Sequence, residues 1–243
     1  MITFGVVILL FCVYQLGWTN VTAHAATDQA SEQLRHSWSQ QPSATASGSS
    51  GASPDASPGA SSGASSGAGS SVVDAFAFIH IPRLGSTYVK PVVAGTDASA
   101  LKKGVGHYTG TVMPGQVGNF AAAGHRATNG EPFRHLDELR PGDFVVIEDA
   151  STWFTYEITP PPSGVGVSQN GRSYDVYPNQ VDVLDPVPNK PGAQPTEKLI
   201  TLTTCDPRWN SKYRMIYHGV LVSQQPKSQG KPNSLAAPAR DGG

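Results

Sequence analysis

Cys205 has the clearest potential for chemistry in this sequence, and it lies in the segment TLTTCDPRWNSKYRMIYHGVL (201–221). The other cysteine, Cys12, lies in an apolar N-terminal run and cannot be its disulfide partner if that run sits in a bilayer. A free cysteine is either an inert core residue or a reactive nucleophile. Because a Thr/Leu strand precedes Cys205 and Asp206-Pro207 follows it, we expect the thiol at a strand end that faces a cleft. This placement favours the nucleophile.

A nucleophilic cysteine needs an imidazole that exchanges protons with it. Among the seven histidines, His125 differs because it ends a strand of small residues, FAAAGH, where Gly124 leaves room for close approach. The other histidines lie in the N-terminal stalk or within strands and short turns, where a structural role is usual. Spacing alone gives His125 only a modest advantage over His107.

The third candidate is Arg214, which opens the last strand nine positions after Cys205. If the two strands pair, the planar guanidinium stands near the thiol and can donate two parallel hydrogen bonds to peptide carbonyls. It could also stabilise an oxyanion. The alternative is a surface charge on an exposed strand face.

The sequence indicates no other reaction chemistry. It contains no Cys-x-x-Cys pair and no paired histidines at helical spacing, so we predict no metal site. The glycines cluster in one low-complexity segment and in isolated turns, so there is no phosphate-binding loop, and we expect no cofactor. The net charge of -1 argues against a nucleic-acid partner.

Residues 1–19 are predicted to form a transmembrane signal-anchor. The run from Ile2 to Trp18 is uncharged and about long enough to cross ~30 Å of hydrocarbon. Tyr14 and Trp18 suit the membrane interface. The alternative is a cleaved signal peptide, because Ala23-His24-Ala25 matches an Ala-x-Ala site. With the anchor retained, the chain would cross the plasma membrane once, with its N-terminus inside and its catalytic domain outside.

Three further segments follow the anchor. Residues 20–71 are predicted to be a stalk and linker: 19–40 suits an amphipathic helix or a disordered segment, and 42–71 is almost wholly Gly, Ala, Ser, Thr and Pro, which cannot offset chain entropy. From 72 to 225, short strands between turn signals predict an all-β barrel or sandwich of ~150 residues with short helices. The tail over 226–243 is expected to be disordered.

Over 72–224 the chain resembles the sortases, most closely the class E sortases of high-GC Gram-positive bacteria. TLTTCDP resembles the family's Thr-Leu-x-Thr-Cys signature, and YRMI with the following Gly219 resembles its arginine strand. GVGHYTGTVMPGQVGNFAAAGHR resembles the stretch that leads to the active-site histidine. The resemblance implies a closed eight-stranded β-barrel. It also implies that Cys205 is the nucleophile, His125 the general acid/base, and Arg214 the group that positions substrate and stabilises the oxyanion.

The resemblance further implies a reaction and its partners. Sortases cut a sorting motif between Thr and Gly, hold the protein as a thioester and pass it to an amine of a cell-wall precursor. Expected partners are therefore secreted proteins with a C-terminal Leu-Ala-x-Thr-Gly or Leu-Pro-x-Thr-Gly motif and a peptidoglycan-precursor amine. Asn129, Thr204 and Tyr213 are predicted to bind the substrate. Asn129 stands where related enzymes often carry a tyrosine, which weakens the expectation that Ala is preferred in the motif.

Two other functions remain open at this stage. An L,D-transpeptidase also uses Cys, His and Arg, but its Ser-x-Gly-Cys pattern differs from Thr203-Thr204-Cys205. A catalytically inactive, membrane-tethered binding module would keep the barrel without turnover. Formation of a thioester with a sorting peptide would separate an enzyme from a binding module.

Overall fold

The chain from residue 75 onward folds mainly into β-strands in the computed structural model, which describes residues 23–40 and 75–236. The strand segments are rich in β-branched and aromatic residues, which pack well on a pleated surface. The strands are β1 (Ala75–His80), β2 (Val89–Ala94), β3 (Val105–His107), β4 (Gly118–Ala123), β5 (Phe144–Glu148), β6 (Thr152–Ile158), β7 (Tyr174–Val176), β8 (Lys198–Asp206) and β9 (Tyr213–Pro226). The short helices are α2 (Ala98–Leu101) and the 3-10 turns η1 (Pro82–Leu84), η2 (Leu136–Glu138), η3 (Asp182–Leu184), η4 (Lys227–Gln229) and η5 (Asn233–Ala236).

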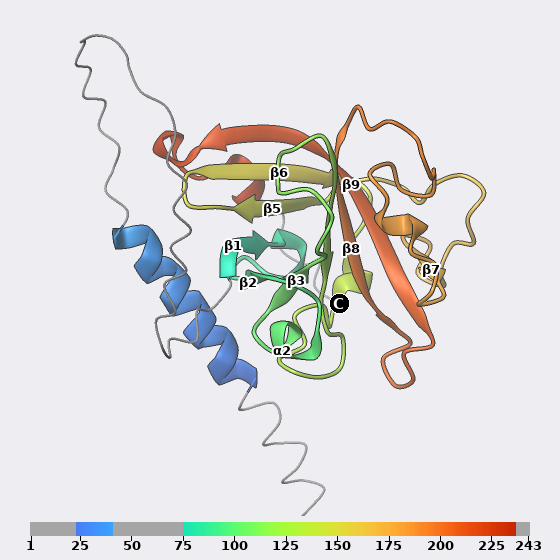
Figure 1. Ribbon diagram of the computed structural model, residues 1–243, viewed down its shortest axis with the longest axis horizontal. Helices are drawn as coiled ribbons and strands as arrows, with labels where there is room; N and C mark the ends of the chain where they lie inside the picture. The colour runs from blue at the N-terminus through green and yellow to red at the C-terminus, as the bar shows by residue number, and fades with distance from the viewer. Residues whose placement is uncertain (1–22, 41–74, 237–243) are drawn as a thin grey trace, which may run out of the picture.

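Eight of these strands close into a barrel (Figure 1). They are hydrogen-bonded neighbours in the order β6-β5-β1-β2-β3-β4-β8-β9, and β9 pairs again with β6, so the ring has no open edge. The predicted closed eight-stranded barrel is confirmed. β7 extends the sheet beyond β9 as a ninth strand. Apolar side chains fill the interior, among them Ile79, Val105, Phe120, Val145, Tyr156, Ile200, Leu202 and Tyr217.

The predicted transmembrane segment lies outside the described residues, as does most of the linker. Within residues 23–40 and 75–236, no helix combines the length and the apolar character needed to cross a membrane. The anchor, the membrane contact and the boundary at residue 72 therefore stay predictions.

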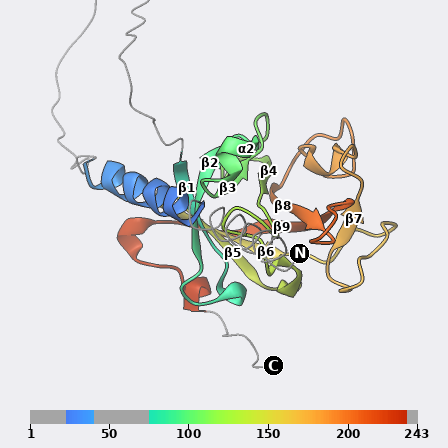
Figure 2. The ribbon, with the colours of Figure 1, turned by 90° about the horizontal axis from the view of Figure 1, so that it is seen from below.

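Residues 23–40 form a helix that packs against the barrel beside β1 (Figure 2). Its buried residues recur at helical spacing, which makes one face apolar. They are Ala23, Thr27, Ala30 and Leu34. One turn further on, the Trp38 ring meets the Phe78 ring edge-on, with centroids 5.3 Å apart. Of the two alternatives for this segment, the amphipathic helix is the one present, and its apolar face packs against the barrel.

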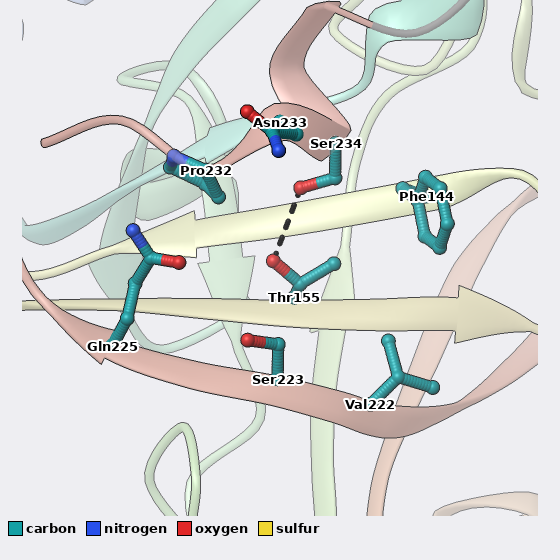
Figure 3. A pocket seen from close by; sticks show the side chains of 8 residues that line it. All are labelled: Phe144, Thr155, Val222, Ser223, Gln225, Pro232, Asn233 and Ser234. Carbon is teal, nitrogen blue, oxygen red and sulfur yellow. Dashed lines mark hydrogen bonds between the residues drawn. The ribbon is translucent and has the colours of Figure 1, made fainter.

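The chain end also differs from the expectation of a disordered tail over 226–243. Residues 226–236 are ordered: β9 runs to Pro226, where it pairs with Thr152, and the chain then turns back over the barrel. There Ser234 Oγ lies 3.1 Å from Thr155 Oγ1, and Pro232 is buried (Figure 3). Because β9 pairs with β6, residues 226–236 lie next to a barrel surface that they can cover. Their Pro-, Ser- and Lys-rich composition gives no sign of this packing. Residues 237–243 lie outside the described part.

The groove under this tail has a volume of about 490 Å³ (Figure 3). Its lining side chains are neutral: Phe144, Thr155, Val222, Ser223, Gln225, Pro232, Asn233 and Ser234. Its hydroxyl groups therefore have no acid or base beside them in the lining to activate them, and the candidate chemistry lies elsewhere on the barrel.

Candidate active site

The ends of β4 and β8 bring together two residues that are far apart in the sequence. The two strands are parallel neighbours, in register up to Ala123 opposite Thr203. Beyond that pair, the Gly124 amide donates to the Thr203 carbonyl at 3.1 Å, and Thr204 Oγ1 donates to the Gly124 carbonyl at 2.7 Å. Because the carboxyl ends of parallel strands share one edge, the residues that follow them are neighbours in space. His125 and Cys205 therefore lie at the same edge of the barrel.

Cys205 faces Arg214 across the next strand pair. β8 and β9 are antiparallel, and their register places Cys205 directly opposite Arg214. Residues directly opposite each other on antiparallel strands have Cβ atoms about 4.5–5.5 Å apart. The strand pairing on which the Arg214 hypothesis depended is thus present.

One cleft of about 250 Å³ contains all three predicted catalytic residues. It is lined by Thr96, Leu101, Tyr108, Ala123, Gly124, His125, Thr203, Thr204, Cys205 and Arg214. The rival histidine, His107, lies in the barrel wall instead, where its ring stacks on Phe120 at 4.9 Å and hydrogen-bonds Thr111 at 2.9 Å. These contacts give His107 a structural place and leave His125 as the imidazole of the cleft.

Burial sets the charge state of His125. Withdrawal from solvent lowers the pKa of His125 below its usual value, because desolvation penalises the charged ring. The neutral imidazole is therefore the resting form near neutral pH. Neutral imidazole can accept the thiol proton and return it later, as a general base and acid must.

The Arg214 guanidinium is held by its own loop. Nη1 donates to the backbone carbonyls of Ser211 and Tyr213, at 3.0 Å each. Two bonds through a single nitrogen fix the orientation of the planar group while Nε and Nη2 keep donor capacity. Arg214 therefore enters the cleft as an oriented, permanent positive charge.

The three predicted substrate-binding residues lie in different surroundings. Thr204 lines the cleft, but its hydroxyl is buried and bonded to Gly124. Asn129 lies beside His125, with Nδ2 3.2 Å from Nε2. The Tyr213 ring packs near the Tyr177 ring, with centroids 5.1 Å apart. Their roles in substrate binding remain predictions.

Sequence reasoning missed the ion pairs of Arg126, which lie next to the catalytic candidates. Arg126 is only 7% exposed; it forms an ion pair with Asp206, a second with Asp137 at 3.2 Å, and a long contact of 3.4 Å from Nη1 to the Cys205 carbonyl. It thus ties the residue after His125 to the residue after Cys205. The signal was present in the sequence, because an Arg and an Asp follow two strand ends that each carry a candidate catalytic residue.

A smaller cavity of about 80 Å³ adjoins the cleft and shares Tyr108, Thr203 and Arg214 with it. Its other walls are mainly apolar and come from β7, η3, the loop between them and β9: Val176, Tyr177, Pro178, Gln180, Val181, Val183, Leu184 and Ile216. The two cavities together form a path that runs from the thiol, past Arg214, to an apolar end. Within the described residues, no group of three His, Cys, Asp or Glu side chains is placed to hold a metal ion.

Comparison with known proteins gives the same family as the motifs. The model of the sortase domain matches residues 79–222. The chain is 40% identical to Sortase SrtE1 of Streptomyces coelicolor over 97% of its own length, and it spans 59% of the length of that relative. Sortase E from Streptomyces avermitilis is 46% identical over 67% of this chain and 97% of that chain, with a TM-score of 0.56. The structure of Sortase E1 from Streptomyces coelicolor with a tripeptide in the active site is 40% identical, covers 67% of this chain and 96% of that chain, and has a TM-score of 0.57. The chain belongs to the sortase family of cysteine transpeptidases.

Proposed function

We propose that this protein is a cysteine transpeptidase in which Cys205, His125 and Arg214 act together. The observation that carries the proposal is their meeting in one cleft: two parallel strand ends supply His125 and Cys205, and the cross-strand partner of Cys205 is Arg214. A nucleophile, a proton carrier and a cationic donor are the groups that acyl transfer needs.

In the first half-reaction, the Cys205 thiol loses its proton to His125, and the sulfur attacks the carbonyl carbon of the scissile peptide bond. The Arg214 guanidinium donates hydrogen bonds to the carbonyl oxygen, which gains negative charge in the tetrahedral intermediate. The imidazolium then gives its proton to the departing amine as the C–N bond breaks. The acyl group remains on sulfur as a thioester.

In the second half-reaction, an incoming amine attacks the thioester carbonyl. Neutral His125 takes a proton from this amine, and the same Arg214 donors stabilise the second tetrahedral intermediate. Collapse breaks the C–S bond, releases the joined product and restores the thiol, with the proton returned from His125. The cycle needs no redox partner, and the atoms balance over the two steps.

We infer that the substrate is a secreted protein with a Leu-Ala-x-Thr-Gly or Leu-Pro-x-Thr-Gly motif, cut between Thr and Gly. The mainly apolar cavity beyond Arg214 suits the aliphatic start of such a motif. The tripeptide named in the active site of the Streptomyces coelicolor relative supports peptide binding in this region. The acceptor is proposed to be a peptidoglycan-precursor amine, and the protein is proposed to act at the outer face of the plasma membrane.

The test is mass spectrometry of the protein mixed with a Leu-Ala-x-Thr-Gly peptide. The expected result is an acyl adduct on Cys205 with release of the Gly-containing fragment, and no adduct in Cys205→Ala. Addition of a small amine should discharge the adduct and yield an amide. Absence of an adduct with any such peptide, from folded protein, would favour the inactive binding module.

Arg214→Lys tests the proposed oxyanion donor. An ammonium keeps the charge but cannot reproduce the planar fork of donors. Loss of an oxyanion donor typically lowers kcat by ~10²- to 10³-fold. The measurement is kcat for peptide cleavage, with Arg208→Lys as a control in the same loop. Near-normal turnover of Arg214→Lys would remove Arg214 from the mechanism.

A further inference from the structure

The loop that follows His125 has an unusual backbone. Asn129, Gly130 and Glu131 have φ angles of 51°, 73° and 45°, so three consecutive residues are left-handed. This region is unfavourable for side chains other than glycine, although Asn tolerates it better than most. Such a conformation persists only where the surroundings hold it, and it tends to accompany function.

Several contacts hold this loop in place. The Glu131 amide donates to the Thr128 carbonyl at 3.1 Å, and the Glu131 carboxylate forms an ion pair with Arg134. On the other side, Gly130 lies under the helix over residues 23–40: a Cβ at that position would stand 3.8 Å from Thr27 Oγ1 and 4.0 Å from Ala23 Cβ. The loop is therefore packed between the helix and the cleft.

The held loop turns two polar side chains toward the imidazole. Asn129 Nδ2 lies 3.2 Å from His125 Nε2, and Thr128 Oγ1 lies 3.5 Å from Nδ1. With the amide nitrogen turned toward the ring, Nε2 accepts, which corresponds to a neutral ring with its proton on Nδ1. Among the described residues, no hydrogen bond joins His125 to Cys205, so the loop makes the side-chain hydrogen bonds of the resting ring.

We propose that Asn129 is a positioning residue for His125 that serves both protonation states of the ring. In the neutral state its amide nitrogen donates to Nε2. When the ring is protonated, the carboxamide turns over and its oxygen accepts from Nε2–H. The proposal rests on the proposed role of His125, and it assigns Asn129 to the imidazole in place of the substrate. A carboxylate at this position can only accept, so it would hold the ring only when Nε2 carries a proton, and an apolar side chain could hold neither protonation state.

The charged groups around His125 decide how a new charge at residue 129 would change the pKa of its ring. Cys205 and Arg214 share its cleft. Of the carboxylates in this part of the fold, Asp206 and Asp137 pair with Arg126, and Glu131 pairs with Arg134. Asp175, which interacts with Asp206 and Arg126, has a buried oxygen without a hydrogen-bond partner among the described residues. A carboxylate introduced at residue 129 would stand beside the imidazole, where the amide nitrogen now lies 3.2 Å from Nε2.

The first test measures the pKa of His125 by NMR in the full chain with isotope-labelled histidine rings, assigned by comparison with His125→Gln. Asn129→Asp keeps the size and the left-handed backbone but places a negative charge beside the ring. An opposite charge at this distance typically shifts a pKa by about 1–3 units, here upward. The matched control is Asn189→Asp, because Asn189 also has a positive φ, of 59°, and its amide donates to the Tyr174 hydroxyl at 2.8 Å. The control should leave the pKa of His125 unchanged.

The second test is kinetic. Asn129→Gly removes the side chain and tolerates the left-handed backbone, so the loop can keep its course. With the ring no longer oriented, kcat for peptide cleavage should fall by at least about fivefold, the equivalent of one neutral hydrogen bond, while KM stays the same. In Asn129→Asp, the limb of the pH–rate profile that belongs to His125 should move upward with the pKa seen by NMR.

The inference requires both results. A pKa shift below about half a unit in Asn129→Asp, or an unchanged kcat in Asn129→Gly, would overturn it. The failure of the proposed function looks different: either no acyl adduct forms on Cys205, or His125→Gln retains turnover. In both cases the NMR titration would still report whether Asn129 holds the ring.

Discussion

The substitution Gly124→Ala tests whether the close approach of the chain after β4 to the core sets the position of His125. A Cβ on Gly124 would stand 2.5 Å from Cδ2 of Phe133, a ring that is fully buried. Ordinary contact begins near 3.4 Å, so the ring or the backbone before His125 must move by about 0.9 Å. The ring has little freedom, since the Phe133 amide also donates to the His125 carbonyl at 2.9 Å.

The expected effect of Gly124→Ala has two parts. Overpacking of a filled core costs about 1–3 kcal/mol of the free energy of unfolding. A displacement of about 1 Å at a catalytic group can lower the rate by ~10²-fold. The assay pairs urea unfolding with kcat for cleavage of a sorting peptide. Gly166→Ala is the matched control, because a Cβ there meets no atom within 4 Å, and both quantities should be unchanged.

A second substitution separates steric crowding from other causes. Phe133→Leu shortens the side chain that the added methyl group would meet, so the pair Gly124→Ala and Phe133→Leu should recover part of the lost activity. The interaction free energy from this double-mutant cycle should be favourable, as expected for residues in contact. Wild-type stability and turnover in Gly124→Ala alone would refute the claim that this approach positions His125.

Two further predictions concern the rest of the barrel. Burial lowers the pKa of His218 to about 4, so the unfolded state binds its proton more readily, and the free energy of unfolding should fall as pH drops below about 6.5. Between pH 7 and pH 5 the free energy of unfolding should fall by about 2 kcal/mol because of His218. In His218→Gln the urea midpoint should therefore change less over this pH range. Equal pH dependence of the two proteins would contradict the prediction. Leu34→Asp should cost about 2 kcal/mol, because the helix over residues 23–40 buries Leu34 and an unpaired carboxylate cannot take its place. The measurement is thermal unfolding beside Glu32→Asp on the same helix, and an unchanged Tm would show that the helix does not pack on the barrel in solution.

Local pattern was sufficient for several parts of the fold. Short strands between turn signals were expected over this part of the chain, and β5 and β6 pair there as antiparallel neighbours. Short helices were expected too, and Asp97 begins the helix Ala98–Leu101, where its side chain accepts from the amides of Ser99 and Ala100. These features depend on residues that are close in the sequence, so short-range chemistry decides them.

Long-range packing decided the features that the pattern concealed. The composition of 23–40 left an amphipathic helix and a disordered segment both open, and that of 226–236 suggested a disordered tail, but both segments pack on the barrel. The helix places Trp38 on Phe78, and the tail places Ser234 on Thr155. Neither partner can be read from the segment itself, because it comes from a strand far away in the chain.

The sequence by itself determined which residues are candidates for catalysis: a cysteine without an accessible disulfide partner, a histidine that ends a strand of small residues, and an arginine that opens the next strand. Spacing alone gave His125 only a modest advantage over His107, so the choice of His125 rested on the resemblance to the sortases, and no role was assigned to Arg126. The tertiary structure decided both points. Parallel pairing of β4 with β8 carries His125 to the edge that holds Cys205, while His107 stacks in the barrel wall. The reason is physical: residue types and short spacings fix what chemistry is available, whereas strand register, which depends on the whole closed ring, fixes which of these groups can meet.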